Sequence, residues 1–376
     1  MRHSAVQVGL SPLLGLLLFL SLTSRAEPPS EAVPAPEWDA QFQRTNGWVG
    51  ADGAYSIPLS QEVTLWLFGD TLVGEVREGK RVNVRMINNS IALQRGTNRP
   101  EFFHRTTRDG QPESFFKPGH GKSYFWPFHG TRTSGGLYLI LHRIETVKTG
   151  NPFGFKFLDA WLGHVANPDD PPSQWRITQK KIPFTTVTSK GALIFGGAVM
   201  CDGDFVYIGG GDSRPQTKQA FLRNGMVLAR VPAEQIGDFK QWRFFANGKW
   251  QTDFKRVTPV FPGVASEFSL SYQAAIKKYV AVYMEGGIFG TILVRLASAP
   301  EGPWSEPRRV YRCPEQDGPL RNFCYAAKAH PELPAAADEL LVTYAVNSWD
   351  FWNLFKEASL YWPRFVRVKL SAASAE

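Results

Sequence analysis

Two acidic residues near the start of the chain have types and spacing that suit acid and base chemistry. Asp70 follows the apolar residues Trp66, Leu67 and Phe68 in the segment WLFGDT, and Asp52 lies in GADGAYS, one strand earlier in what we expect to be the same hairpin. A carboxylate at the end of a buried strand is costly unless it is hydrogen-bonded or functional. Paired carboxyl groups are typical of glycoside hydrolysis, where one protonates the leaving oxygen and the other acts as nucleophile or as base toward water. Asp52 and Asp70 are therefore the candidate catalytic pair.

Both acids also have simpler explanations. Asp-Gly, as in Asp52 and Gly53, is a common hairpin-turn dipeptide, and Asp70 could cap the end of its own strand. The distance between the carboxyl groups would decide the stereochemical outcome. A separation of about 5 Å gives retention of the anomeric configuration, and roughly 6.5 to 9.5 Å gives inversion. Sequence alone does not decide which acid is the nucleophile. Our working assignment takes Asp52 as the nucleophile and Asp70 as the acid and base.

Seven further polar or aromatic residues stand at the beginnings of expected strands, where a side chain could contact a sugar. Each also has a structural explanation, because Asn favours turns, a Trp between sheets packs in the core, and a lone His beside Pro is commonly structural. The candidate substrate-binding residues are Asn88, Asn89, Ser90, Trp126, His129, Glu267 and His330.

Short strands bounded by Gly, Pro, Asn and Asp dominate the chain, as expected for an all-β fold. One pattern recurs in GGLYLILHRIE (135–145), GDFVYIGGGD (203–212) and KKYVAVYMEGG (277–287), each followed by a second strand and a loop closed by Trp175, Trp242 or Trp304. Weaker copies begin at VTLWLFGDT and at DELLVTYAVNS. Repeats of this length suit four-stranded blades that bury their faces against each other. We predict a five-bladed β-propeller; the alternative is a pair of β-sandwiches.

The beginning of the chain has the pattern of an export signal. Arg2 and His3 precede an apolar run from Leu13 to Leu22, and the small residues of TSRA follow, so residues 1–26 are predicted to be a cleaved signal peptide. A retained membrane anchor is the rival interpretation, but the run is short for a span of about 20 residues. Residues 27–45 are predicted to be a flexible lead and residues 46–372 a single propeller domain. The expected location is secreted or periplasmic, with no stable membrane insertion.

The charges argue against a nucleic-acid partner, and the cysteines allow one disulfide and argue against a zinc site. The formal charge is +8 but its residues are scattered, whereas a nucleic-acid groove would need a clustered stripe. Cys313 and Cys324 bracket a loop and could form a disulfide in an oxidising compartment, which leaves Cys201 as an expected buried thiol. No spacing resembles a zinc site. We expect a monomer without a cofactor, with a structural calcium ion left open.

Several motifs together resemble a known protein family. GWVGADGAYSIPL, LWLFGDT and MINNSIAL, and later VLARVP, GPWSE, AHPEL and YWPRFVRV, resemble a family of secreted bacterial proteins labelled as a domain of unknown function. Some of its members are endo-D-arabinanases that cut the arabinan of mycobacterial cell-wall polysaccharide. The resemblance covers roughly residues 46–370 and implies a five-bladed propeller with retaining hydrolysis by two aspartates, which match Asp52 and Asp70.

The resemblance does not give the substrate, because one fold hosts several functions. The first hypothesis is an exported glycoside hydrolase that cleaves a polysaccharide or oligosaccharide. The second is a propeller that binds a glycan or a protein without turnover, with its acids acting as hydrogen-bonding groups of turns and channel.

Overall fold

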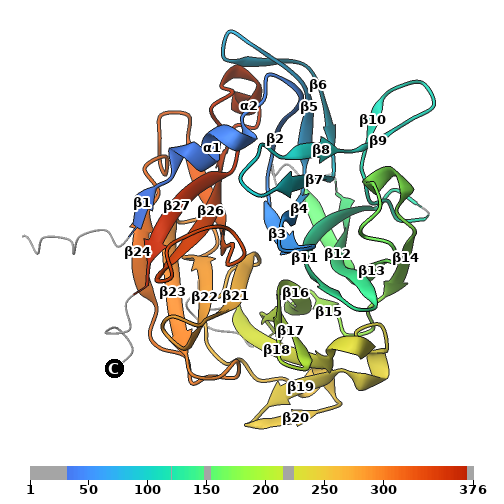
Figure 1. Cartoon of the computed structure of the whole chain (residues 1–376), viewed down its shortest axis with the longest axis vertical. Helices are drawn as coiled ribbons and strands as arrows, with labels where there is room; N and C mark the ends of the chain where they lie inside the picture. The colour runs from blue at the N-terminus through green and yellow to red at the C-terminus, as the bar shows by residue number, and fades with distance from the viewer. Residues whose placement is uncertain (1–31, 120, 148–153, 215–223, 371–376) are drawn as a thin grey trace, which may run out of the picture. The chain divides into compact units, whose positions relative to one another are not determined.

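Strands form most of the protein, and helices are few and short (Figure 1). The computed structural model describes residues 32–119, 121–147, 154–214 and 224–370. The predicted signal peptide, residues 1–26, and the last two residues of the predicted domain lie outside the described residues. The all-β prediction is confirmed.

Five antiparallel sheets of at least four strands follow one another along the described chain (Figure 1). Their strands, in spatial order, are β3, β4, β7 and β8 (Tyr55–Pro58, Val63–Phe68, Ser90–Arg95, Glu101–Phe103); β11 to β14 (Tyr124–Thr133, Gly136–Thr146, Phe155–Val165, Ile177–Lys181); β15 to β20 (Thr186–Thr188, Gly191–Asp202, Phe205–Asp212, Gly225–Pro232, Arg243–Ala246, Lys249–Gln251); β21 to β24 (Phe268–Gln273, Lys278–Met284, Thr291–Ala297, Arg308–Arg312); and β25, β26, β27 and β1 (Asn322–Ala329, Glu339–Ser348, Arg364–Lys369, Ala32–Pro34).

Smaller elements complete the described fold. A three-stranded sheet holds β2, β5 and β6 (Asn46–Ala51, Thr71–Arg77, Lys80–Ile87), and β9 pairs with β10 (Arg105–Thr106, Pro112–Glu113). The helices are α1 and α2 (Pro36–Phe42, Asn353–Lys356), with 3-10 turns at Pro172–Gln174, Ala233–Gln235, Phe239–Gln241 and Phe254–Arg256. No helix in the described ranges is long and apolar enough to cross a membrane.

The strand pairs predicted from the repeats are confirmed. In four of the five large sheets the two repeat strands are the second and third strands, and in the sheet of β15 to β20 they are the third and fourth, β17 and β18. In all five they pair antiparallel. The tryptophans that close three repeats also share a contact: Trp175, Trp242 and Trp304 each donate an indole N–H to a backbone carbonyl four to six residues earlier. The repeat therefore encodes a strand pair and the anchored loop that follows it.

One strand of each large sheet lies against a strand of the next sheet. β3 contacts β11, β11 contacts β16, β16 contacts β21, and β21 contacts β25. β25 reaches back to the segment between β2 and β3, because Lys328 donates a hydrogen bond to the Gly53 carbonyl. These contacts link the five large sheets in the order in which they follow along the chain.

The flexible lead predicted for residues 27–45 is wrong for its described part. β1 pairs with β27, so the beginning and the end of the described chain share one sheet. In α1, Trp38 and Phe42 are buried and pack on Phe365, with ring centroids 5.8 and 5.3 Å apart. Two aromatic residues four positions apart give a single apolar face, and Pro36 is tolerated in the first turn. The Pro-rich composition concealed this pattern.

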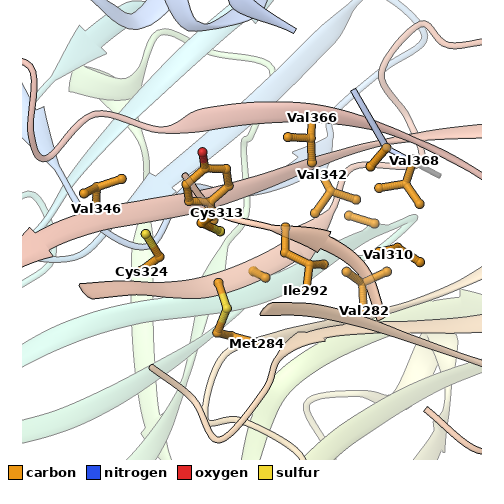
Figure 2. Packing of buried hydrophobic residues seen from close by; sticks show 14 of the residues in the cluster. Val282, Met284, Ile292, Val310, Cys313, Cys324, Val342, Val346, Val366 and Val368 are labelled. Atoms are coloured by element: carbon orange, nitrogen blue, oxygen red, sulfur yellow. The ribbon is translucent and has the colours of Figure 1, made fainter. Parts of the chain in front are cut away.

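A large apolar cluster lies between the last two large sheets and contains two of the cysteines. Figure 2 shows Cys313 and Cys324 among Val310, Val346 and their neighbours in this cluster. Both are free thiols in the structure, so the disulfide that the sequence allows is not formed here. The third thiol differs from its prediction: Cys201 is exposed rather than buried, near the end of β16.

Candidate active site

Asp52 and Asp70 lie at matching positions between two strand ladders. β2 pairs with β5 and β3 pairs with β4 in one continuous register, and the two aspartates fall opposite each other in the short gap between these pairs. The Asp52 N–H donates to the Asp70 carbonyl at 3.3 Å, and the Gly69 N–H donates to the Asp52 carbonyl at 3.0 Å. Opposite residues of antiparallel strands project to the same face. The fold therefore presents both carboxyl groups on one side.

Gly69 is what allows the two acids to face each other so closely. A Cβ atom at this position would overlap the Oδ1 atom of Asp52. Across the gap, Gly53 has a φ of +88°, in the left-handed region that favours glycine. The sequence WLFGDT thus ends a buried strand with the one residue that leaves room for the opposite carboxyl group.

The Asp70 carboxyl group is held by two N–H donors. Trp126 donates its indole N–H to Oδ1 at 2.9 Å, and the Asn88 side-chain amide donates to the same atom at 3.2 Å. Burial raises the pKa of Asp70 to about 6, while these two hydrogen bonds oppose the rise because they stabilise the ionised form.

The Asp52 carboxyl group accepts from a hydroxyl donor rather than from N–H groups. The Tyr325 hydroxyl donates to Oδ2 at 3.0 Å. Burial raises the pKa of Asp52 to about 8, and the negative charges of Asp70 and Glu267 contribute to the rise. Asp70 therefore ionises first, and Asp52 keeps its proton near neutral pH.

A buried lysine supports the Asp52 side of the site. The Lys328 ammonium group donates to the carbonyls of Gly53 and Ala326 and lies 4.5 Å from the centre of the Tyr55 ring. Burial lowers the pKa of Lys328 to about 8, although the charges of Glu267 and Asp52 oppose this. Its positive charge in turn lowers the pKa of Asp52.

A bulge in β25 aims Lys328 and Tyr325 at the same place. The ladder between β25 and β26 shifts register between these two residues, and Ala326 within the shift has a φ of +57°. Without the bulge, residues three apart would point to opposite faces of the strand. With it, both side chains project to the face on which Asp52 lies.

Both carboxyl groups open into a pocket of about 700 Å³, a size typical of ligand sites. Aromatic side chains form much of its wall, and the charged residues that line it are all acidic. The aromatic lining residues are Tyr55, Tyr124, Trp126, Phe128, Phe155, Phe323, Tyr325, Phe351 and Tyr361, and the acids are Asp52, Asp70 and Glu267. Aromatic faces beside acids can hold sugar rings against two proton-transfer groups.

Two of the predicted substrate-binding residues line this pocket. Trp126 lies against Asp70, as described above, and its ring packs edge-on against Phe155 at 4.7 Å between centroids. Glu267 immediately precedes β21 and interacts through its charge with Asp52 and Lys328. Asn88 does not line the pocket but contacts Asp70 directly.

Asn89 and Ser90 are placed differently from their prediction. The Asn89 amide donates to the carbonyls of Phe116 and Phe125 and accepts from the Phe116 N–H, so its hydrogen-bonding groups are used inside the fold. The Ser90 hydroxyl bonds to that of Thr71 at 2.9 Å. Both residues are buried and neither lines the pocket, so we do not carry them forward as substrate-binding residues.

The two predicted histidines also serve the fold rather than the pocket lining. His129 accepts from the Val199 N–H and bonds to the Ser56 carbonyl at 3.1 Å, and burial lowers its pKa to about 4. His330 is buried between the hydroxyl groups of Ser56 and Thr343. Each imidazole joins neighbouring strands in its neutral form.

Sequence reasoning missed Tyr325, Lys328 and Tyr361. Tyr325 and Tyr361 line the pocket, and the Tyr361 hydroxyl donates to the Asp70 carbonyl at 3.1 Å. One signal was present: Lys328 is a lone charge in the apolar segment FCYAAKA, where an unpaired ammonium would be costly. Among the described residues, no group of three or more His, Cys, Asp or Glu side chains could hold a metal ion.

Comparison with known proteins assigns the family. Residues 36–370 match the family described as Domain of unknown function (DUF5005). The chain belongs to this family. A comparison of this DUF5005 protein with curated proteins found no significant match.

Solved structures resemble the DUF5005 chain over most of its length. A Bacteroides ovatus protein, provisionally described as a hydrolase, has a TM-score of 0.72 at 17% identity and covers 89% of both chains. The GH43_1 enzyme from Xanthomonas citri in complex with xylotriose has a TM-score of 0.48 at 12% identity, with 91% of this chain and 96% of that chain covered. Of these two, only the Bacteroides ovatus structure is similar enough to support a shared fold. At 17% identity, this similarity says nothing about activity.

Proposed function

We propose that this protein is an exported glycoside hydrolase that cleaves a polysaccharide with Asp52 and Asp70 as its carboxyl pair. The observation that carries the proposal is the register of the two strand ladders, which sets both carboxyl groups opposite each other at one pocket. A protonated and an ionised carboxyl group side by side are what glycoside hydrolysis requires.

The proposed scaffold is a five-bladed β-propeller. Support comes from the five large sheets, from the ordered contacts among β3, β11, β16, β21 and β25, and from the pairing of β1 with β27 in the last sheet. Pairing of the first and last strands in one sheet would close such a ring. The pocket would then lie at one end of the central channel.

The hydrogen bonds favour the reverse of our working assignment of the two acids. Asp70 accepts two N–H donors and ionises first, which suits a nucleophile. Asp52 keeps its proton near neutral pH, which suits the acid that protonates the leaving oxygen.

The reaction is proposed to be retaining. Cβ atoms of opposite residues in antiparallel strands are about 4.5 to 5.5 Å apart, so the two carboxyl groups can come within the short separation of about 5 Å that retaining enzymes use. Asp70 would form a glycosyl ester at the anomeric carbon while Asp52 gives its proton to the leaving hydroxyl. Asp52 would then take a proton from water as that water attacks the ester, which restores both groups.

The substrate is proposed to be a polysaccharide outside the cytoplasm, cut by a monomer. Aromatic lining suits stacking on sugar faces, and the predicted signal peptide suits export. Arabinan is the specific candidate, and it rests on the resemblance of the sequence motifs alone.

The first test is a product screen with the purified protein. The panel holds D-arabinan, L-arabinan, fructan, xylan and galactan, and released oligosaccharides are measured by chromatography. Asp52→Asn and Asp70→Asn should each lower the rate at least about a thousandfold, while Asp109→Asn, the same change at an exposed position, should match the parent. Release by the parent but by neither site variant supports the proposal, and the anomer formed first shows retention or inversion.

A binding propeller without turnover is the second candidate. The observation that favours it is that both carboxyl groups already accept hydrogen bonds within the fold. Binding of a panel glycan by all four proteins with no product from any of them would replace the hydrolase with this function.

A further inference from the structure

A second pocket of about 760 Å³ lies on the sheet of β11 to β14 and shares no lining residue with the first. Its lining includes Trp161, Ile177 and Phe115 together with the cationic side chains of Arg105, Arg143 and Lys117. The Arg143 guanidinium group lies 5.7 Å from the centre of the Trp161 ring, and that of Arg105 lies 5.6 Å from the centre of the Phe115 ring. Its size suits an oligosaccharide or another ligand of similar volume. The pocket therefore combines aromatic with cationic side chains.

A buried acid fixes the key side chains of this pocket. Asp159 is 3% exposed and accepts two hydrogen bonds from Arg143, at 2.8 and 2.6 Å, and one from the Trp161 indole at 2.7 Å. Lys181 adds an ion pair at 2.9 Å. A bidentate pair of this kind is rigid. Arg143 and Trp161 are therefore held in place before any ligand arrives.

The cations outnumber the acids that could neutralise them. Both nearby carboxylates are already engaged, Asp159 as described and Glu113 with Lys117 at 2.8 Å. Arg105 donates its Nε–H to the Phe115 carbonyl at 2.7 Å, and its guanidinium group lies 5.6 Å from the centre of the Phe115 ring. The Arg143 side chain remains 28% exposed. The site thus keeps positive charge for an incoming anion.

We propose that this second pocket binds an anionic oligosaccharide, with a sugar face on Trp161 and a carboxylate or phosphate group between Arg105 and Arg143. Guanidinium groups match the planar, two-oxygen geometry of such anions, and an indole face suits the C–H groups of a sugar ring. The first pocket is lined by acids and aromatic residues, which disfavours anions there. The two pockets therefore select opposite ligand classes, and this inference does not depend on the proposed hydrolysis.

Isothermal titration calorimetry tests this binding directly. The probes are tetragalacturonate and the neutral β-1,4-galactotetraose, added to full-length protein carrying Asp52→Asn so that turnover cannot interfere. We expect tetragalacturonate to bind at least about tenfold more tightly, since a hydrogen bond to a charged group contributes at least that factor. Raising the NaCl concentration should weaken the binding of the acidic probe.

Three variants test whether binding depends on the residues of this pocket rather than on positive charge elsewhere on the surface. Arg105→Gln should weaken tetragalacturonate binding about tenfold, and because Arg105 is exposed its replacement leaves the core intact. Arg108→Gln removes the same charge from an exposed position outside the pocket and should change nothing. Trp161→Ala should weaken binding as well. The melting temperature of this variant is measured to check that it is folded.

Three results would overturn the inference. These are absence of tetragalacturonate binding, equal affinity for the neutral tetramer, and equal losses from Arg105→Gln and Arg108→Gln. Inorganic phosphate is titrated as a further probe: weak displacement of tetragalacturonate supports recognition of a glycan, whereas binding of phosphate as tight as that of the tetramer would show a simple anion site.

Discussion

Asp52 and Asp70 face each other across a gap between two strand ladders but differ in their hydrogen-bond donors. Asp70 accepts two N–H groups, from Trp126 and Asn88, while Asp52 accepts from a hydroxyl group, that of Tyr325. Two carboxyl groups so close cannot both ionise easily. Burial and the charge of Asp70 hold the proton on Asp52, while the two N–H donors favour the ionised form of Asp70.

Replacing Asp52 with Asn should stabilise the protein at alkaline pH. The unfolded chain loses this proton near the ordinary value of 3.8, whereas the folded protein holds it up to about pH 8. The folded state thus binds more protons across this range, and its stability falls as pH rises through it. Asp52→Asn removes the loss, so its unfolding free energy should exceed that of the parent by about 1 to 3 kcal/mol at pH 8 and match it near pH 4.

Urea unfolding at both pH values measures this difference. Asp109→Asn is the control, because Asp109 is exposed and its replacement should not produce a gain that grows with pH. A constant difference between Asp52→Asn and parent across the range would contradict a raised pKa for Asp52.

The rate of hydrolysis should depend on pH through both acids. Asp70 must be ionised to attack, so kcat/KM should fall as pH drops below about 6. Asp52 must be protonated to act as the acid, so the rate should also fall above about 8. A bell-shaped profile between these limits is expected from initial rates on the substrate found in the screen. A rate that stays constant to pH 10 would exclude Asp52 as the acid.

Removing a donor from Asp70 should move one limb of this profile. Trp126→Phe keeps an aromatic ring at the pocket but deletes the N–H that stabilises the ionised carboxyl group. The pKa of Asp70 should rise by about one unit, and the acid limb should shift to higher pH by the same amount. The alkaline limb should stay in place, and a shift of both limbs would point to a general disturbance of the pocket.

The strands of this fold could be predicted because their pattern repeats. Runs of apolar residues recur in the paired strands β12 and β13, β17 and β18, and β22 and β23, and Trp175, Trp242 and Trp304 mark the loops that follow. The hairpin that joins Asp52 to Asp70 was predicted from the same short-range signals. Local sequence was sufficient for all of these features.

The surroundings of the pair could not be predicted, because they come from distant parts of the chain. Tyr325 and Lys328 reach Asp52 through a bulge at Ala326, and alternation along β25 would have placed them on opposite faces. His129 and His330 misled us for the opposite reason. Their neighbours in sequence do not reveal that backbone and hydroxyl groups of other strands occupy both ring nitrogens.

Lys328 should influence both the stability and the pH profile. Lys328→Met removes the donor to the carbonyls of Gly53 and Ala326, which should cost about 2 to 4 kcal/mol of unfolding free energy. It also removes the positive charge that lowers the pKa of Asp52, so the alkaline limb of kcat/KM should move to higher pH. Lys369→Met deletes the same charge from a side chain that is 67% exposed and should shift neither property. An unchanged alkaline limb in Lys328→Met would limit this lysine to a structural role.

Gly69→Ala tests whether the close approach of the two acids is needed. The added methyl group would overlap Asp52 Oδ1, so the carboxyl group must turn away from Asp70 while the strands on either side stay paired. A misplacement of about 1 Å in a reacting group can cost roughly a hundredfold, and kcat should fall by about that factor. Gly237→Ala is the control, since its Cβ would meet its nearest neighbour, Tyr138, at an ordinary 3.8 Å. Full activity in a folded Gly69→Ala protein would mean that the reaction does not depend on Asp52 lying where this structure has it.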